Sequence, residues 1–328
     1  MLYLTSDIKI ANWNGIKANK VVWKTDINSF TDTATIDLPR ISYLKTVQTE
    51  TVDINQPNKR EEYVFKEGDK ISILLGYDGH NVKRFEGFVK RVNMGVPVKI
   101  ECEGYSYLLY DIIFNRSYAH VTVKQLLTDV CGKTEIVLSP EMPDIPLTNV
   151  RFKNATGIQV LEWLQKECHL AVYFDFNVLY VGTQFGKKQA TAKFRLGWNT
   201  IKEDDFKKRI VDKNVRIVIK EKNANGEVKK TKSDVQKYSD EKSIKVKAGI
   251  PAALLKQIVN RLQTKDNYRG YEGSIVAFLE PAVTKGMIAD ITDKKYGDRQ
   301  GTYFIESVSG EFGTGGGRQT IQLGFMKK

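Results

Sequence analysis

The stretch from residue 68 to residue 110, GDKISILLGYDGHNVKRFEGFVKRVNMGVPVKIECEGYSYLLY, constrains the fold more than any other part of the sequence. Ile71, Ile73 and Leu75 alternate with their neighbours, which is the period of a half-buried strand. Turn residues at 77–81 and 93–95 separate this strand from two more strands. The sequence therefore predicts an antiparallel meander, and a sheet of this kind closes on itself or packs on another element.

The end of the chain repeats the pattern of this meander. Residues 286–325 read GMIADITDKKYGDRQGTYFIESVSGEFGTGGGRQTIQLGF, and Gly286 corresponds to Gly68. The segment 304–309 corresponds to 88–93, and the strands that end at Gly324 and Gly104 also match. One interpretation is that the subunit contains two related small barrels. The alternative is coincidence, because turn-strand-turn sequences look alike.

The regions around the two meanders have patterns of their own. Residues 1 to about 66 show strand alternation that completes the first meander and supplies the strands of a small barrel. Thr122 and Thr156 are each placed to cap a helix, and a predicted hairpin follows at 170–181. The predicted apolar faces are Val123, Leu126, Leu127 and Val130 in the first helix, and Ile158, Leu161, Leu164 and Cys168 in the second.

Strand patterns return from about residue 197. An Asn-Gly turn is predicted at 223–226, and a single helix begins at Pro251. The sequence thus predicts an α+β, mainly β fold with two similar small antiparallel β-barrels flanking an α+β insert. The predicted domains are 1–110 for the first barrel, 111–185 for the insert, and 186–328 for the second barrel with one interrupting helix.

Half of the net charge of +12 lies between residues 201 and 250, which hold fifteen Lys and Arg against nine Asp and Glu. Such an excess is typical of a face that binds a polyanion. The alternative is a solvated pair of strands whose lysines guard a sheet edge, and the scarcity of aromatic residues in this stretch favours that alternative.

No catalytic motif is present in the sequence. The three histidines, His80, His120 and His169, form no metal-spaced cluster. The three cysteines lie outside any C-x-x-C pattern, so we expect buried side chains in a reducing cytoplasm. The glycine-rich segment 313–317 lacks the Lys-Ser/Thr of a phosphate loop and indicates a hairpin tip. We therefore expect no enzyme activity, no metal and no cofactor.

The sequence also shows no signal-peptide pattern and no long apolar run, so we expect no membrane insertion by this chain.

Several local patterns occur in a characteristic order. They are GDKISILLGY, FEGFVKRV, IECEGYSYLL, VTVKQLLTDVC, ATGIQVLEWLQKECHLAVYFDFNVLYVG, PAALLKQIVNRL, GMIADIT and GTYFIESVSG. In this order the chain resembles the baseplate hub family of contractile phage tails, also called late control protein D, and the hub part of type VI secretion spike proteins. The resemblance covers nearly the whole chain. It rests on order and spacing rather than on a diagnostic motif.

The resemblance implies a structural baseplate hub of a phage tail or related injection machine. In that family three subunits form a ring whose six barrels match the sixfold tail tube on one side and the threefold spike on the other. It implies a homotrimer, a tail tube protein and a tail spike protein as partners, and a place in the virion tail baseplate after assembly in the bacterial host cytoplasm. The chain shows no valine-glycine repeat and no lysozyme-like segment, so we expect the spike to be a separate protein.

Contacts between such subunits are expected to pair sheet edges and bury side chains. Side chains from the meander strands and tips are candidates for these contacts, although residues of this kind are more often core than contact. The five candidate interface residues are Tyr77, Phe85, Phe88, Tyr303 and Phe304.

Two other functions remain open. One is a nucleic-acid or polysaccharide-binding protein built on OB-like barrels, although no motif supports a contact with DNA. The other is a tail enzyme that cleaves peptidoglycan.

Overall fold

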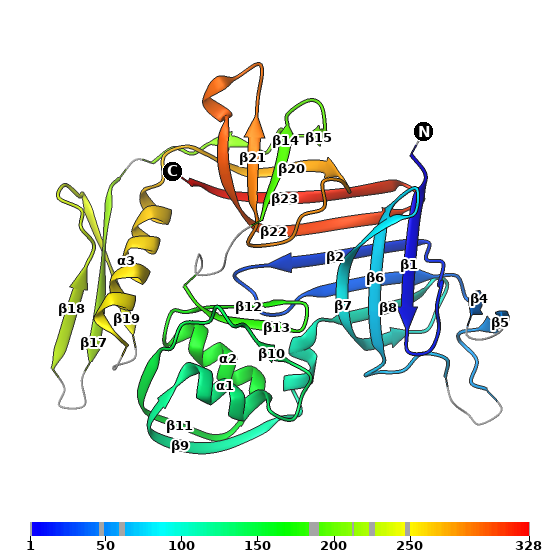
Figure 1. Ribbon diagram of the computed structural model, residues 1–328, viewed down its shortest axis with the longest axis horizontal. Coiled ribbons are helices and arrows are strands. Elements are labelled where there is room, and N and C mark those ends of the chain that lie inside the picture. Colours follow the sequence, from blue (N-terminus) through cyan, green and yellow to red (C-terminus); the bar gives the residue numbers. More distant parts are fainter. Residues whose placement is uncertain are drawn as a thin grey trace.

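The computed structural model describes residues 2–45, 49–58, 63–183, 190–211, 213–222, 227–246 and 250–327. Strands predominate over helices, which confirms the α+β, mainly β class (Figure 1). Within these ranges no helix combines the length and the apolar composition that a membrane crossing requires.

The first meander forms where the sequence predicted it. Strand β6 pairs antiparallel with β7, and β7 pairs with β8. The N-terminal strand β1 pairs with β6, while β3 lies between β8 and β2. In β2 exposed and buried residues alternate, so one face packs on the core. The elements are β1 (Leu4–Ile10), β2 (Lys20–Asp26), β3 (Thr33–Leu38), β4 (Ile41–Lys45), β5 (Thr49–Asp53), β6 (Lys70–Tyr77), β7 (His80–Asn93) and β8 (Val98–Glu103).

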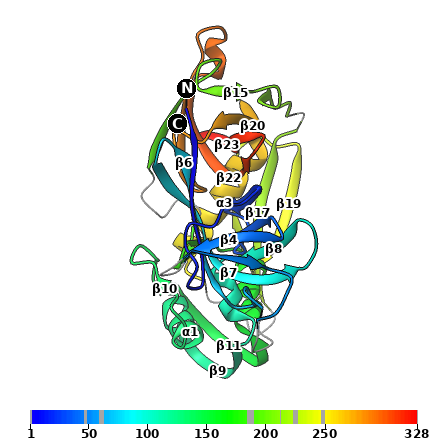
Figure 2. The ribbon, with the colours of Figure 1, turned by 90° about the vertical axis from the view of Figure 1, so that its right-hand side faces the viewer.

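The insert combines two helices with short sheets. Both predicted caps are confirmed, because the Thr122 and Thr156 side chains each accept a hydrogen bond from the backbone of a glutamine three residues later, in a complete capping box. Figure 2 shows the insert at the end of the molecule opposite β15. The elements are η1 (Tyr105–Leu109), β9 (Ile113–Thr122), α1 (Val123–Cys131), β10 (Val137–Leu138), β11 (Pro146–Thr156), α2 (Gly157–Lys166), β12 (Ala171–Asp175) and β13 (Val178–Gly182).

The second meander follows the same course as the first. Strand β21 pairs with β22, and β22 with β23, around the glycine-rich hairpin tip that the sequence predicted. Unlike β1 in the first meander, β14 pairs in parallel with its neighbour β21. The elements are β14 (Thr191–Arg195), β15 (Thr200–Lys202), β16 (Lys207–Lys208), β20 (Tyr271–Phe278), β21 (Ile288–Thr292), η2 (Gly297–Arg299), β22 (Gly301–Gly313) and β23 (Gly316–Lys327).

An outlying unit interrupts the second meander in sequence. Strands β17 (Val215–Lys222), β18 (Val228–Lys232) and β19 (Asp240–Val246) form a separate sheet, with α3 (Ala252–Asn267) packed on it. The unit lies apart from the main sheet (Figure 1). Its apolar side chains join the hydrophobic core of the insert. The predicted Asn-Gly turn at 223–226 lies outside the described residues, although the strands on either side of it pair antiparallel.

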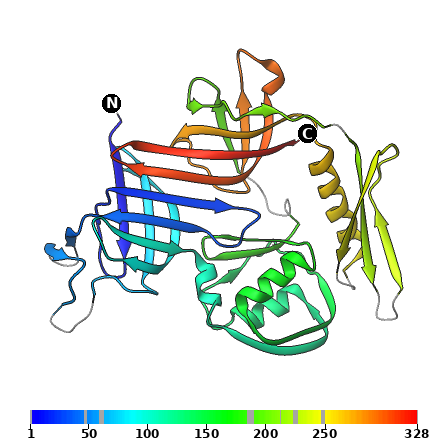
Figure 3. The same cartoon turned by 180° about the vertical axis from the view of Figure 1, so that it is seen from behind.

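One sheet passes through both meanders. Strand β2 pairs antiparallel with β22 over seven residues, so the strand order runs β1-β6-β7-β8-β3-β2-β22-β23-β20-β15. This continuous sheet is seen from behind in Figure 3. The sequence offered no signal for this junction, because strand pairing between residues nearly 300 positions apart leaves no local pattern. The division into domains 1–110, 111–185 and 186–328 stays a prediction.

Candidate functional site

All five candidate interface residues are buried within the subunit. Tyr77 is 8% exposed, Phe88 6%, Phe85 2%, Phe304 1% and Tyr303 0%. A side chain buried in its own subunit has no area to offer a neighbour in this conformation. These residues are core residues here, and any interface has to be sought on other side chains.

The β2–β22 junction divides the main sheet into a first half, which contains β1–β3 and β6–β8, and a second half, which contains β14–β16 and β20–β23. Buried polar groups form hydrogen bonds between the two halves beside this junction. The Tyr77 hydroxyl donates to the Gly317 carbonyl at 3.0 Å. Arg84 is 5% exposed and donates to the Leu279 carbonyl at 2.5 Å, and burial lowers the pKa of its guanidinium to about 10. Gln319 is fully buried; its side-chain oxygen accepts from the Arg84 guanidinium at 3.5 Å across the junction, and its amide nitrogen donates to backbone carbonyls of its own half. Each of these groups would cost free energy if left unpaired, so they specify one alignment of the halves.

We call this contact region between the two halves the seam. It also contains a buried ion pair. The Lys285 ammonium lies 2.5 Å from the Asp32 carboxylate, and their side chains are 3% and 11% exposed. Burial raises the pKa of the Asp32 carboxyl, although the charge of Lys285 acts in the opposite direction. Asp175 of the insert also raises this pKa. The pair therefore lies where the first half, the second half and the insert meet.

The correspondence between the two meanders extends to backbone hydrogen bonds. Gly68 has a φ of 85° and its N–H donates to Val89, whose own N–H donates back to Asp69, both at 2.8 Å. Gly286 has a φ of 83° and its N–H donates to Ile305, whose N–H donates back to Met287, both at 2.9 Å. Glycine adopts this left-handed conformation without strain. The same turn thus introduces the same pair of strands in each half.

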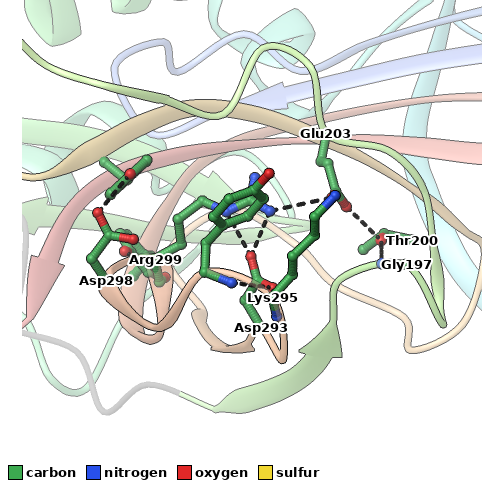
Figure 4. Close-up of polar contacts among 10 residues, drawn as sticks. Gly197, Thr200, Glu203, Asp293, Lys295, Asp298 and Arg299 are labelled. Atoms are coloured by element: carbon green, nitrogen blue, oxygen red, sulfur yellow. Dashed lines mark hydrogen bonds and ion pairs between the residues drawn. The ribbon is translucent and has the colours of Figure 1, made fainter.

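Two segments at the end of the second meander form a cross-linked tip, made of residues 196–203, which include β15, and residues 293–300. The Leu196 N–H donates to the Thr292 carbonyl at 3.0 Å, which joins the bases of the loops. Arg299 bridges them, because its guanidinium binds the carboxylates of Asp293 and Glu203 (Figure 4). Glu203 also accepts from the Thr200 hydroxyl, whose oxygen receives the Gly197 N–H.

The tip presents aromatic side chains to solvent. Trp198 is 74% exposed and Tyr296 49%. The Arg195 guanidinium lies 5.2 Å from the centre of the Trp198 ring, and that of Arg299 lies 4.9 Å from the Tyr296 ring. Trp, Tyr and Arg are the residues most enriched at protein-contact hot spots. The sequence contained these residues in turns, but only the fold brings the two loops together.

The described residues hold little that suggests catalysis. No group of three or more metal-ligating side chains lies together among them. All three cysteines are buried, as predicted, and burial raises the pKa of the Cys131 thiol to about 12.

Comparison with solved structures identifies the class of protein that has this fold. The tail protein of Neisseria meningitidis MC58 has a TM-score of 0.66 at 12% identity, over 98% of this chain and 96% of that one. The 43 kDa tail protein of prophage MuSo2 from Shewanella oneidensis has a TM-score of 0.64 at 13% identity, over 98% of both chains. No family model and no curated protein matches the sequence.

The same fold occurs in a secretion system. The c3393 protein of Escherichia coli, a component of the type VI secretion system, has a TM-score of 0.59 at 8% identity, over 98% of this chain and 77% of that one. The chain therefore has the fold of phage tail proteins and of a type VI secretion component, which is the fold that the sequence resemblance implied.

Proposed function

We propose that this chain is a structural, non-enzymatic hub subunit of a contractile phage tail or a related injection machine. Three subunits form a ring that adapts a sixfold tail tube to a threefold spike in the tail baseplate. The observation that carries this proposal is the β2–β22 junction, which joins two similar halves in one sheet. The fold shared with tail proteins supports the same role.

Each half contributes an equivalent succession of strands to the sheet. The order is β7, β8, β3, β2 in the first half and β22, β23, β20 and then β15 and β16 in the second. Trp23 of β2 lies opposite Ala34. The antiparallel pairing of Lys207 with Glu272 puts Phe206 opposite Gly273. Trp23 and Phe206 are both buried aromatic residues at the same place in their halves.

This equivalence predicts how one subunit meets the next. Strand β2 pairs with β3 on one side and with β22 on the other. Its counterparts, β15 and β16, pair with β20 on one side and end the sheet on the other. The counterpart of β22 is β7. Residues 90–93 of β7 pair only with β8 in the described ranges, so the other edge of β7 is unpaired there. We therefore place β16 of one subunit beside β7 of its neighbour. A contact of this kind closes into a ring by rotation and covers both open edges.

The inner junction also sets the register. Lys24 lies opposite Ser309 in the β2–β22 pair. The residue that corresponds to Lys24 is Lys207, and the residue that corresponds to Ser309 is Asn93. The proposed ring therefore puts Lys207 opposite Asn93 of the neighbouring subunit.

A double variant, Asn93→Cys with Lys207→Cys, tests this register. Opposed residues in an antiparallel pair have Cα atoms about 4.5–5.5 Å apart, which a disulfide can span. We expect disulfide-linked dimers and trimers after oxidation. In the control pair, Asn93→Cys with Lys202→Cys, position 202 lies four residues from position 207 as measured along β20, which is about 13 Å, so this pair should stay unlinked. The native cysteines are buried and should not interfere.

Light scattering at micromolar concentration, in physiological salt and with tail tube or spike protein present, tests the ring itself. We expect a species of about three times the 37.3 kDa subunit mass. Monomer under all of these conditions would contradict the ring. A trimer that fails to cross-link would instead retain the ring and reject the proposed edges.

A further inference from the structure

The outlying unit carries a row of lysines across its three strands. Lys220 in the central strand β17 lies opposite Lys230 of β18 on one side and opposite Lys245 of β19 on the other. Opposed residues project from the same face of a sheet, so the Cα atoms of these three lysines lie within a span of about 10 Å. Lys232 lies two residues from Lys230 and belongs to the same face.

This lysine face, made of Lys220, Lys230, Lys232 and Lys245, is turned away from α3. The residues that flank Lys220 in sequence project to the opposite face, where Ile219 packs in the core with α3. Lys230, Lys232 and Lys245 are exposed, and Lys220 is half-buried. The unit lies at one end of the molecule (Figure 1). Val218, on the same face between Arg216 and Lys220, is 1% exposed, so the exposed part of this face consists of the lysine side chains around it.

Repulsion between these lysines is not relieved by acids in the described part of the chain. Lys242 and Lys256 of the same unit pair with Asp266 and Asp234. No ion pair joins a lysine of the row to a described residue. The acid of this face, Glu241, lies opposite Arg216, four residues along β17 from Lys220. Like charges placed directly opposite each other destabilise a sheet. Lysines on the two outer strands would be enough to protect the sheet edges, so protection does not explain the third lysine, Lys220, on the central strand.

We propose that the lysine face binds the phosphate backbone of duplex DNA without regard to sequence. Duplex DNA carries about one negative charge per 1.7 Å of its axis, so about 10 Å of duplex presents about six phosphates, enough to contact all four lysines. Lysine is a point charge that contacts phosphate without the forked geometry with which arginine reads bases. The four lysines themselves offer no aromatic platform on which single-stranded bases stack. The ring of Tyr238, beside this face, is already stacked with the Arg216 guanidinium, which lies 3.8 Å from the ring centre. The proposal concerns a surface separate from β7 and β16, and it does not depend on the ring.

The test compares two triple variants of the full chain in binding a fluorescent 20-base-pair duplex. The first is Lys220→Gln, Lys230→Gln and Lys245→Gln. The control is Lys17→Gln, Lys66→Gln and Lys133→Gln, which removes three exposed lysines elsewhere and lowers the net charge equally. Dissociation constants are measured by anisotropy from 20 to 200 mM salt.

We expect the first triple to reduce the slope of log affinity against log salt by about 0.9 for each phosphate that is no longer neutralised, and the control to retain the wild-type slope. The melting temperature of the first triple should be unchanged or higher, because repulsion is removed. Equal reductions of the slope in the two triples would overturn the site. So would the absence of wild-type binding at 20 mM salt.

Discussion

Lys285 and Asp32 show how a single buried contact can fix the relation between distant parts of a chain. They are 253 positions apart, and their side chains are almost fully enclosed. The attraction between two buried charges offsets their desolvation only in part, so the pair contributes more to specificity than to free energy. Removing one member, however, leaves the other charge uncompensated.

We predict that Lys285→Met lowers the free energy of unfolding by about 3–5 kcal/mol, because Asp32 remains buried without its partner. Urea denaturation measures this change. A matched control is Lys166→Met, which breaks an exposed pair with Glu162 and should change the free energy by less than about 0.5 kcal/mol. Similar effects of the two substitutions would contradict the account of the seam.

Asp293 in the tip gives a pH dependence of known sign. Burial alone would raise the pKa of its carboxyl, but hydrogen bonds from the Tyr296 and Lys295 backbone and from Arg299 outweigh burial and hold the pKa below its usual value. The folded state thus binds this proton less readily than the unfolded state. The ionised Asp293 carboxylate therefore stabilises the folded state at pH values above the pKa that this carboxyl has in the unfolded chain. This stabilisation is lost as the pH falls through the lower pKa of the folded state.

We predict that Asp293→Asn flattens the fall in unfolding free energy below about pH 4, where the wild-type carboxylate becomes protonated. Urea denaturation between pH 2 and pH 6 measures this difference. Asp204→Asn, at an exposed position nearby, should leave the wild-type profile in place. An unchanged profile for Asp293→Asn would mean that the hydrogen bonds of the tip do not hold in solution.

At the scale of elements, the helices of the insert follow directly from local sequence. The Thr122 and Thr156 caps and the apolar faces behind them were predicted, except that Cys168 lies two residues beyond the end of α2, although it is buried in the same core. Local signals suffice there because capping and periodicity involve residues within one or two turns. The parallel pairing of β17 with β19 had no such signal, since it joins strands across an intervening strand and crossover.

We predict that Thr122→Ala and Thr156→Ala each cost about 1 kcal/mol, because each removes the acceptor for an N-terminal amide of its helix. Thermal denaturation measures the loss. Thr128→Ala is the control, since the Thr128 hydroxyl donates only to the Lys124 carbonyl within α1 and is not a cap. A loss from Thr128→Ala as large as from the caps would argue against the capping boxes.

At the scale of the whole molecule, the two halves are bound so closely that we predict a single unfolding transition. The β2–β22 pairing, the Arg84 contacts and the Lys285–Asp32 pair all cross the seam. A variant that keeps only Trp23 reports the first half by fluorescence, and a variant whose single Trp replaces the buried Phe206 reports the second. Coincident denaturation midpoints are expected, and two separate midpoints would show that the seam is weak.

The whole-molecule arrangement was only partly predictable from sequence. The echo of Gly68 in Gly286 was visible, because each glycine fills a turn that requires positive φ. Residue type alone does not separate contact residues from core residues, because large aromatic side chains in a meander are usually buried in the core. The five predicted contact residues are buried in this way: Tyr77, Phe85, Phe88, Tyr303 and Phe304. Side chains such as Asn93 and Lys207 became candidates only once the register of the inner junction was known.

The β2–β22 junction also bears on how assembly responds to dilution. In the proposed ring, half of the junctions between sheet modules lie inside a chain and form as the chain folds. Modules tethered in this way meet at effective concentrations near the millimolar range, whatever the dilution outside. Ring formation then scales with the third power of subunit concentration, whereas six separate modules would require the sixth power. A chain that carries its own first junction can therefore complete a ring at copy numbers where unlinked modules would remain apart.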